Sequence, residues 1–568
     1  MSAASGVAKR GLDLASTIER RLTAVRPVPV LAALVALQLA QALYFGFRTP
    51  HNGWIWYSGG DATSYWTEQW ALGHLELPRA VVGYALPVFY AWVPLVAGPA
   101  LVNGAAVIVI LQVALLVPLA LIFFWLLADR LFGRVYAWAA AALWVAGPLL
   151  LLHGFVPNYH WVFDQLFLAP HWFGFANMAD LPSVVAVLAC AWLTLRAFDT
   201  RSSTDAVLAG LLGGLTLAVK PSNGFFVPAV AVLLLGGRRC REAGLWTAGV
   251  IPALVTLTLW KARGLGYLPI TSSSYEHLHL AAGAHPVAFS ASRYLPFNLR
   301  HLYDELQNLR EVFWSLRFLE FLGVAGLFGV IRKAPLRGLF VAVWFVGYCV
   351  VKASSSRSDF PSATFFRLAE PGLPAYILLV VGVAFCLPRL GRRLASPAPL
   401  PAAAARRLDV RRLAPAVALL ALIPLALVLA ARNPTTMKAA FDGNVVQEAP
   451  LTNALHLRDV RNRNGTITLS WRTPDVGSTK PGYVVYMTGD YLDNGCHPPA
   501  NGALVCKLDT MQRVGTTQAN SFTLTNPALV SQSRWFRVAL VASYQPWNAN
   551  GDLMLVSGPV FTPHLHSS

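Results

Sequence analysis

The residues best suited to chemistry lie in an aromatic segment that follows the first apolar run of the chain. Its sequence is Trp54-Ile-Trp-Tyr-Ser-Gly-Gly-Asp61-Ala-Thr-Ser-Tyr65-Trp66. Aromatic faces stack on the apolar faces of sugar rings, and a carboxylate accepts hydrogen bonds from sugar hydroxyls. The segment therefore suits a sugar bound beside a membrane, with Tyr65 and Trp66 in contact with it. An interfacial aromatic belt with a solvated Asp61 would give the same pattern.

A second group of polar residues lies between positions 153 and 180. It consists of His153, His160, Asp164, His171 and Asp180. Their spacings fit no standard pattern of metal ligands, so we assign no metal ligand here and leave a divalent metal open as a cofactor. We expect His160, Asp164 and Asp180 to contact substrate. For Asp180, which precedes Leu-Pro and an apolar run, capping of a helix is an equally good interpretation.

The composition of the chain identifies the elements that position these residues. The 568 residues are 55% hydrophobic and 13% charged, with a mean hydropathy of +0.51. Soluble proteins carry roughly a quarter charged residues, so a soluble enzyme is excluded. The net charge of +18 would suit nucleic acid. The Arg clusters of the chain, however, lie between apolar runs, where they set membrane orientation. We therefore expect no nucleic-acid partner.

Apolar runs of bilayer length predict a polytopic α-helical membrane protein with about 11 transmembrane helices. The first run, Val30 to Phe47, lacks a cleavage pattern and is interpreted as a retained span. Residues 81–127 are expected to cross once, and residues 205–236 to form a hairpin with Lys220 at its outer tip. The remaining predicted spans are 135–153, 181–198, 245–260, 316–331, 338–352, 372–388 and 413–431, and the single crossing within 81–127 is placed at 104–127.

The basic clusters between these runs predict the orientation, because loops rich in Lys and Arg stay in the cytoplasm. We therefore expect a multi-pass protein of the plasma membrane with a cytoplasmic N-terminus and an extracytoplasmic C-terminal domain. The regions predicted to face outward are 48–103, 153–180, 262–315, 353–371 and the tail from 432. The candidate residues named above thus share one side of the membrane.

The tail differs from the rest of the chain. Residues 450–563 alternate apolar and polar positions, which predicts an all-β sandwich. The runs TLSWRTP, GYVVYMT and FRVALVAS resemble a fibronectin type III domain. We expect Cys496 and Cys506 to form a disulfide, because they are close in sequence and face an oxidising compartment. The predicted domains are a basic N-terminus (1–28), a transmembrane domain (29–431), a linker (432–449) and the sandwich (450–568).

Five segments together resemble the GT-C superfamily of integral membrane glycosyltransferases. The first is Gly-Asp61-x-x-x-Tyr65 after the first span, although several relatives carry a second acid beside this one. The others, in chain order, are YALPVFYAWVPLVAGPALVNG, Phe-Ala-Asn-Met-Ala-Asp180-Leu-Pro, Gly-Gly-Leu-Thr-Leu-Ala-Val-Lys220-Pro and Phe-Phe-Arg367-Leu-Ala-Glu-Pro-Gly-Leu-Pro374. Each motif is weak alone, and their order and shared outer side make the combination specific.

The resemblance implies an inverting transfer of sugar from a polyprenyl-phosphate donor to an envelope glycan, glycolipid or protein. In this mechanism Asp61 acts as the base, and the phosphate is bound by Lys220, Arg293, Arg357 and Arg367. For each cation, snorkelling to lipid headgroups is the alternative interpretation, and Glu370 could pair with Arg367. A transporter or flippase of lipid-linked sugars is the main rival function, and an envelope anchor that displays the β domain is a third.

Overall fold

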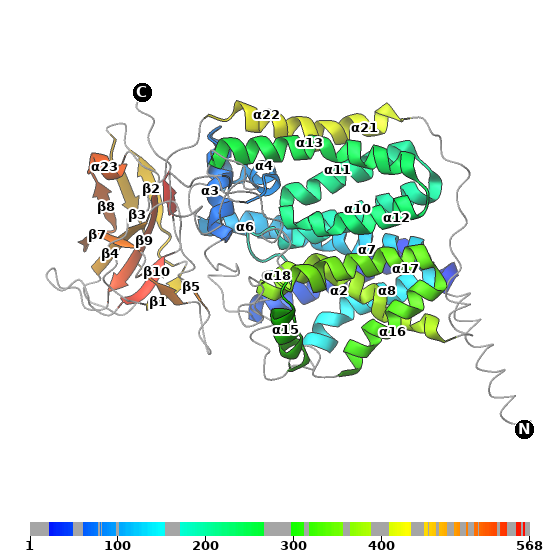
Figure 1. The fold of residues 1–568 in the computed structure, drawn as a ribbon. Helices are drawn as coiled ribbons and strands as arrows, with labels where there is room; N and C mark the ends of the chain where they lie inside the picture. Colours follow the sequence, from blue (N-terminus) through cyan, green and yellow to red (C-terminus); the bar gives the residue numbers. More distant parts are fainter. Residues whose placement is uncertain are drawn as a thin grey trace, which may run out of the picture.

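The computed structural model describes helices up to Ala430 and strands beyond it (Figure 1). The described residues are 22–48, 61–77, 80, 82–97, 101–153, 168, 171–265, 297–311, 317–355, 364–387, 408–432, 448–452, 454–461, 465–473, 482–488, 496–497, 505–508, 511–530, 534–541, 553–557 and 560–562. The sandwich region is therefore described by its strands and adjoining turns, and the helical region by nearly all of its predicted spans.

Seven helices in the described part of the chain are long and apolar enough to cross a membrane. Three of them are single helices: α2 (Pro27–Arg48), α10 (Asp180–Thr200) and α13 (Cys240–Leu265). Two more are α6 (Leu101–Leu111) continued by η1 (Gln112–Leu116) and α7 (Val117–Phe132), and α17 (Pro335–Phe345) continued by η8 (Val346–Lys352). The last two are α18 (Thr364–Ala369) continued by η9 (Glu370–Gly372), α19 (Leu373–Gly382) and η10 (Val383–Cys386), and α21 (Val410–Val417) continued by η11 (Ala418–Leu422) and α22 (Ile423–Ala430).

Shorter helices occupy the other predicted spans. They are α8 (Arg134–Ala146) with η2 (Gly147–His153), α11 (Ser203–Val219), η5 (Pro221–Phe226) with α12 (Val227–Gly236), and α16 (Arg317–Lys333). Each of the predicted spans thus coincides with a helix, and the predicted fold class is confirmed. Residues 364–371, expected to face outward, are helical and lead directly into α19, because Pro371 and Pro374 fall in first turns that need no amide donor. The side of the membrane on which they lie stays a prediction.

In the described part of the helical region, four further helices lie outside the predicted spans: α3 (Asp61–Gly73), α4 (Ala85–Tyr90), α5 (Val93–Ala97) and α15 (Leu299–Glu311). The short α4 and α5 and the long helix after them fit the predicted single crossing of 81–127. Helices α3 and α15 run across the direction of the long helices, at the end of the bundle that lies near the strands (Figure 1). Orientation across a membrane stays a prediction.

Glycines allow two pairs of long helices to pack closely. A Cβ at Gly210 of α11 would lie 2.1 Å from the Trp246 carbonyl oxygen of α13. A Cβ at Gly326 of α16 would lie 1.7 Å from the Leu379 carbonyl oxygen of α19. Small residues at such crossings let helix backbones approach in membrane proteins, so these two helix pairs depend on glycine for their close packing.

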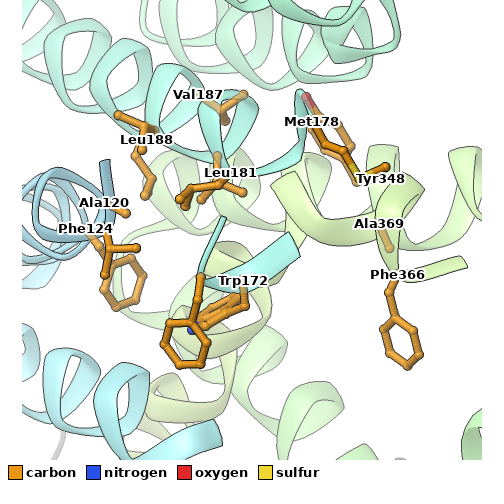
Figure 2. Close-up of a cluster of buried hydrophobic side chains, with 14 of the residues drawn as sticks. Ala120, Phe124, Trp172, Met178, Leu181, Val187, Leu188, Tyr348, Phe366 and Ala369 are labelled. Carbon is orange, nitrogen blue, oxygen red and sulfur yellow. The ribbon is translucent and has the colours of Figure 1, made fainter. Parts of the chain in front are cut away.

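The apolar core surrounds the first half of α10. Figure 2 shows Leu181, Val187 and Leu188 of this helix beside Ala120 and Phe124 of α7, with Tyr348, Phe366 and Ala369 farther along. These side chains, together with Trp172 and Met178, are buried. The start of α10 is therefore held on several sides, and polar groups placed there are largely removed from water.

The C-terminal region forms two β-sheets that pack through one apolar core. The smaller sheet has the order β2-β3-β8, and the larger has the order β5-β6-β1-β10-β9-β4-β7 with β11 also paired to β9. The strands are β1 (Glu448–Thr452), β2 (Arg458–Arg461), β3 (Ile467–Ser470), β4 (Gly482–Thr488), β5 (Cys496–His497), β6 (Val505–Lys507), β7 (Gln512–Thr517), β8 (Ser521–Leu524), β9 (Arg534–Val541), β10 (Leu553–Ser557) and β11 (Val560–Thr562), with the short α23 (Pro527–Val530). The predicted all-β domain is confirmed.

Two finer predictions for this region remain open. The fibronectin type III resemblance stays a prediction, as do the domain boundaries. Cys496 and Cys506 are direct partners on the antiparallel strands β5 and β6. This register brings the two backbones together, and the disulfide itself stays a prediction.

Candidate functional site

The centre of the candidate site is Asp180, in the first turn of α10 and only 1% exposed. Its Oδ1 accepts a hydrogen bond from Lys220 Nζ at 2.7 Å. Its Oδ2 lies 3.3 Å from His171 Nδ1 and 3.7 Å from Arg367 Nε. The N-cap of α10 is Ala179, and it makes no side-chain cap hydrogen bond. The capping interpretation of Asp180 was therefore wrong, because its carboxylate binds cations instead.

Lys220 reaches the site because the chain leaves the helical conformation there. It lies between α11 and η5 with extended backbone angles, φ −148° and ψ 109°, and Pro221 begins the next helix. Besides Asp180, its ammonium group donates to the Arg367 carbonyl oxygen at 3.1 Å. The turn is fixed by Asn223, whose Nδ2 donates to Ser183 Oγ at 3.1 Å. Lys220 and Arg367 are thus joined to Asp180 rather than extended toward lipid headgroups.

Arg367 and Glu370 come from one helical turn, where α18 passes into η9. A spacing of three residues places two side chains on the same face of a helix. Trp344 Nε1 donates to the Pro371 carbonyl oxygen at 2.8 Å and holds this turn. A Cβ at Gly372 would lie 2.7 Å from Tyr348 Cβ, so the turn can approach η8 only with glycine there.

Glu370 is fully buried, and in the described part of the chain neither of its carboxylate oxygens has a hydrogen-bond partner. His171 Nδ1 and Asp180 Oδ2 lie 3.3 Å apart as an ion pair, and neither atom makes a well-formed hydrogen bond to a described residue. Arg367 is three residues before Glu370 and acts on it electrostatically, and the ion pair between them stays a prediction. An unsatisfied buried polar group is costly, and three that converge indicate a missing partner.

These unsatisfied atoms have the arrangement of a metal site. His171, Asp180 and Glu370 each offer one ligand atom, and the three atoms lie within 4.8 Å of one another. One imidazole and two carboxylates suit a divalent metal. Burial lowers the pKa of His171, which favours the neutral imidazole that a metal requires. The residues present therefore could hold such an ion, although the sequence spacing gave no metal pattern.

The cations are the accessible members of this cluster. The side chains of Lys220 and Arg367 are 18% and 24% exposed, whereas that of Asp180 is 1% exposed. A ligand that enters the site therefore meets the ammonium and guanidinium groups before it meets the carboxylates. Such a pair of cations suits an anionic group of a substrate.

An apolar cavity of about 240 Å³ lies beside the cluster. It is lined by residues of α15, α16, η8, α18 and α19, among them Leu302, Leu306, Val324, Leu327 and Phe366. Phe366 and Ala369 line the cavity. Each directly precedes a charged residue of the cluster, Arg367 or Glu370. One turn of helix therefore faces an apolar cavity on one side and the charged cluster on the other.

The aromatic first-loop segment is joined to this site through α3. Asp61 begins α3, and its side chain lies outside the described part. Gln69 of α3 exchanges two hydrogen bonds with Asn177, at 3.0 and 3.1 Å, just before Asp180. Tyr65 and Trp66 are buried, and a Cβ at Gly104 would overlap the Trp66 ring. Trp66 is thus packed as a core residue, and the substrate contacts of both aromatics stay predictions.

Of the predicted site residues, the structure brings together Asp180, Lys220 and Arg367. His160, Asp164, Arg293 and Arg357 lie outside the described residues. The site also contains His171 and Glu370, which the sequence analysis noted without assigning a function. A His nine residues before the central acid and a Glu three residues after the central Arg were the available signals, and neither spacing is diagnostic alone.

No protein-family model and no curated protein sequence matches this chain. Among solved structures, the chain is similar to the apo form of the Archaeoglobus fulgidus oligosaccharyltransferase, with 14% identity, a TM-score of 0.38, and 72% of this chain and 57% of that chain covered. It is also similar to the complex of that enzyme with Zn and sulfate, with 14% identity, a TM-score of 0.36, and 71% and 54% covered.

The chain thus spans less than two thirds of the length of the structures it matches. At these TM-scores, the geometry of the charged cluster and the apolar cavity is the better guide to what the site can bind.

Proposed function

We propose that this protein is a membrane glycosyltransferase that transfers a sugar from a polyprenyl-phosphate donor to an acceptor outside the cytoplasm. The observation that carries this proposal is the pair of accessible cations, Lys220 and Arg367, beside both a buried carboxylate and an apolar cavity. A lipid phosphate matches both features: its anionic head suits the two cations, and its apolar chain suits the cavity.

The donor would bind with its phosphate at Lys220 and Arg367 and its isoprenoid chain in the cavity lined by Phe366 and Ala369. Bound in this way, the phosphate is fixed relative to α10 and α18 while the lipid stays in an apolar environment. Fixing a reacting group against its catalytic residues lowers the barrier by removing motional freedom before the reaction.

The chemistry follows from this placement. The oxygen of an acceptor hydroxyl attacks the anomeric carbon of the donor sugar from the side opposite the phosphate, which inverts the configuration. The bond between that carbon and the phosphate oxygen breaks, and the phosphate leaves with the electron pair. Lys220 and Arg367 stabilise the charge that develops on it, and Asp61 takes the hydroxyl proton as general base.

His171, Asp180 and Glu370 would hold a divalent metal through one imidazole nitrogen and two carboxylate oxygens. When bound, such an ion supplies a Lewis acid for a phosphate oxygen. Asp180 also orients the Lys220 ammonium group through the 2.7 Å hydrogen bond.

The acceptor would be an envelope glycan, glycolipid or protein, with the β domain placed to contact it on the outer side of the plasma membrane. This placement rests on the distribution of basic clusters between the helices. Reporter fusions test it: alkaline phosphatase fused after residue 440 should be active, and fused after residue 200 inactive. Activity at the second position would reverse the orientation.

The direct test is release of radiolabelled sugar from a polyprenyl-phosphate sugar by the purified full-length protein in detergent. Transfer to an envelope acceptor fraction supports the proposal, and Lys220→Met should reduce this transfer by about 10²-fold or more. A transporter or flippase, the alternative, would instead move the intact lipid-linked sugar across vesicles without cleavage. Translocation with no sugar released would replace the proposed function.

A further inference from the structure

We infer that the site binds a divalent metal and a lipid phosphate cooperatively, with Asp180 as the residue that couples them. The inference rests on the proposed function and deepens it by assigning an energetic link between two ligands of one site. It follows from how the two oxygens of a single carboxylate are shared.

Asp180 divides its oxygens between the two halves of the cluster. Oδ1 accepts the hydrogen bond from Lys220 Nζ at 2.7 Å, on the side of the accessible cations. Oδ2 has no hydrogen-bond partner among the described residues and faces His171 Nδ1 at 3.3 Å. Within the metal-ligand group, the Glu370 oxygens are likewise unsatisfied. Oδ1 therefore faces Lys220 of the phosphate subsite, whereas Oδ2 lies between His171 of the metal subsite and, at 3.7 Å, Arg367 of the phosphate subsite.

The charges of the cluster make each ligand unfavourable alone. Its acids are Asp180 and Glu370, and its bases are Lys220 and Arg367, so the four formal charges cancel. A phosphate alone would add negative charge and compete with Asp180 for Lys220. A divalent metal alone would add positive charge near Arg367, whose Nε is 3.7 Å from Asp180 Oδ2. In a buried site such uncompensated charge is costly.

When both ligands bind, their charges compensate each other. The phosphate draws Lys220 and Arg367 toward itself, which leaves the Asp180 carboxylate available to the metal. The metal in turn balances Glu370, whose buried carboxylate has no described hydrogen-bond partner. Each ligand therefore prepares the site for the other, and by linkage the gain must be equal in both directions.

The test measures binding to the full-length protein in detergent, with Mn²⁺ as the metal and farnesyl phosphate as the lipid phosphate. We expect saturating Mn²⁺ to tighten farnesyl phosphate binding by about 5-fold or more, a typical lower bound for coupled sites. Saturating farnesyl phosphate should tighten Mn²⁺ binding by the same factor. Isothermal titration calorimetry gives both affinities, and electron paramagnetic resonance of free Mn²⁺ checks the second.

Two variants separate the halves of the site. Glu370→Gln should weaken Mn²⁺ binding and remove the coupling, while farnesyl phosphate measured in EDTA binds at least as tightly as to the wild type, because one negative charge of the cluster is gone. Lys220→Met should weaken farnesyl phosphate binding in EDTA. Because Glu370→Gln keeps the shape of the side chain, it also controls for complexes of Mn²⁺ with phosphate formed in the micelle.

The outcomes distinguish the inference from the function on which it rests. Farnesyl phosphate affinity that is equal with Mn²⁺ and with EDTA overturns the coupling and leaves the proposed donor intact. If farnesyl phosphate does not bind in either condition, the proposed donor fails and the coupling with it. Inorganic phosphate and phosphatidic acid serve as the other phosphate sources. Coupling seen with farnesyl phosphate and with neither of the other two phosphates supports an isoprenoid chain in the cavity. Equal coupling for all three phosphates would overturn the placement of the isoprenoid chain but not the coupling itself.

Discussion

Each end of α10 carries an aspartate whose side chain is at most 4% exposed, and the two aspartates have opposite roles. At the C-terminal end, Asp199 is bound by Arg130 NH1 at 3.0 Å and by Arg337 NH2 at 2.8 Å. Arg337 also donates to the carbonyl oxygens of Arg130 and Leu131 at 2.8 and 2.9 Å. Both oxygens of Asp199 have a partner, and they tie α10 to α7 and α17.

At the N-terminal end, Asp180 lies among groups whose hydrogen-bonding capacity is not filled. Oδ2 of Asp180, Nδ1 of His171 and both oxygens of Glu370 lack hydrogen-bond partners in the described region. A buried charge with a full set of hydrogen-bond partners is typical of a structural ion cluster. A buried charge beside other unsatisfied polar atoms is typical of a site that binds a ligand. The comparison therefore separates a structural ion cluster from a functional one within a single helix.

The largest expected effect comes from Lys220→Met. Loss of the cation removes stabilisation of the leaving phosphate, so sugar transfer should fall by about 10²- to 10³-fold, as for loss of one preorganised donor. Donor binding should weaken as well. The measurement is the initial rate of transfer per folded protein, with folding checked by size-exclusion chromatography. A transfer rate close to that of the wild type would mean that Lys220 at Asp180 has only a structural role, as Arg337 has at Asp199. The contrast between the two ends of α10 would then be wrong.

Asp61→Asn tests whether the base lies outside the charged cluster. The amide keeps the size of the side chain but cannot take a proton, so transfer should fall by about 100-fold or more. Binding of farnesyl phosphate and Mn²⁺ should be unchanged, because those ligands are assigned to the cluster at Asp180. If the variant transfers sugar normally, the base lies elsewhere, and Asp180 and Asp164 are the next candidates.

Arg337→Met is the matched change at the other end of α10, since it also removes a cation from a buried aspartate. Breaking a fully buried ion pair costs about 3 to 5 kcal/mol. Here Asp199 keeps Arg130 and the Arg337 side chain is 19% exposed, so we expect a loss of about 1 to 3 kcal/mol, between buried and exposed pairs. Thermal unfolding in detergent measures the loss, and transfer per folded molecule should not change. A selective loss of transfer would contradict a purely structural cluster.

The fold was largely predictable because its signals are local. Apolar runs, Arg clusters and prolines mark the helices one segment at a time, and the alternation of residues 450–563 marks the strands. The break at Lys220 could be predicted in the same way, from Pro-Ser-Asn-Gly directly after it. The start of α18 could not, since a helix that begins in a loop of mixed polarity depends on its packing against η8.

The site was only partly predictable because it depends on contacts between distant segments. Asp180, Lys220 and Arg367 each lie in a motif, and the sequence could name them. That Glu370 would be buried without a partner depends on where η9 meets α10. Trp66 shows another such contact: the sequence did not reveal that Gly104 makes room for its ring in the core, and its contact with sugar stays a prediction. Whether a buried polar atom has a hydrogen-bond partner depends on how distant segments pack together. The spacing of residues in the sequence does not reveal it.

The smallest expected effect concerns Asp205, at the start of α11 near the structural end of α10. Its carboxylate is bound by Arg196 Nε at 3.0 Å and by Arg412 NH2 at 3.3 Å, and the Arg412 side chain is 44% exposed. Because an exposed partner is screened by solvent, Arg412→Met should cost less than about 1 kcal/mol, while Asp205 keeps Arg196. The midpoint of thermal unfolding should therefore move less than in Arg337→Met, with transfer and metal binding unchanged. A larger shift than in Arg337→Met would mean that exposure does not rank these partners, and that the structural end of α10 is stabilised mainly through α21.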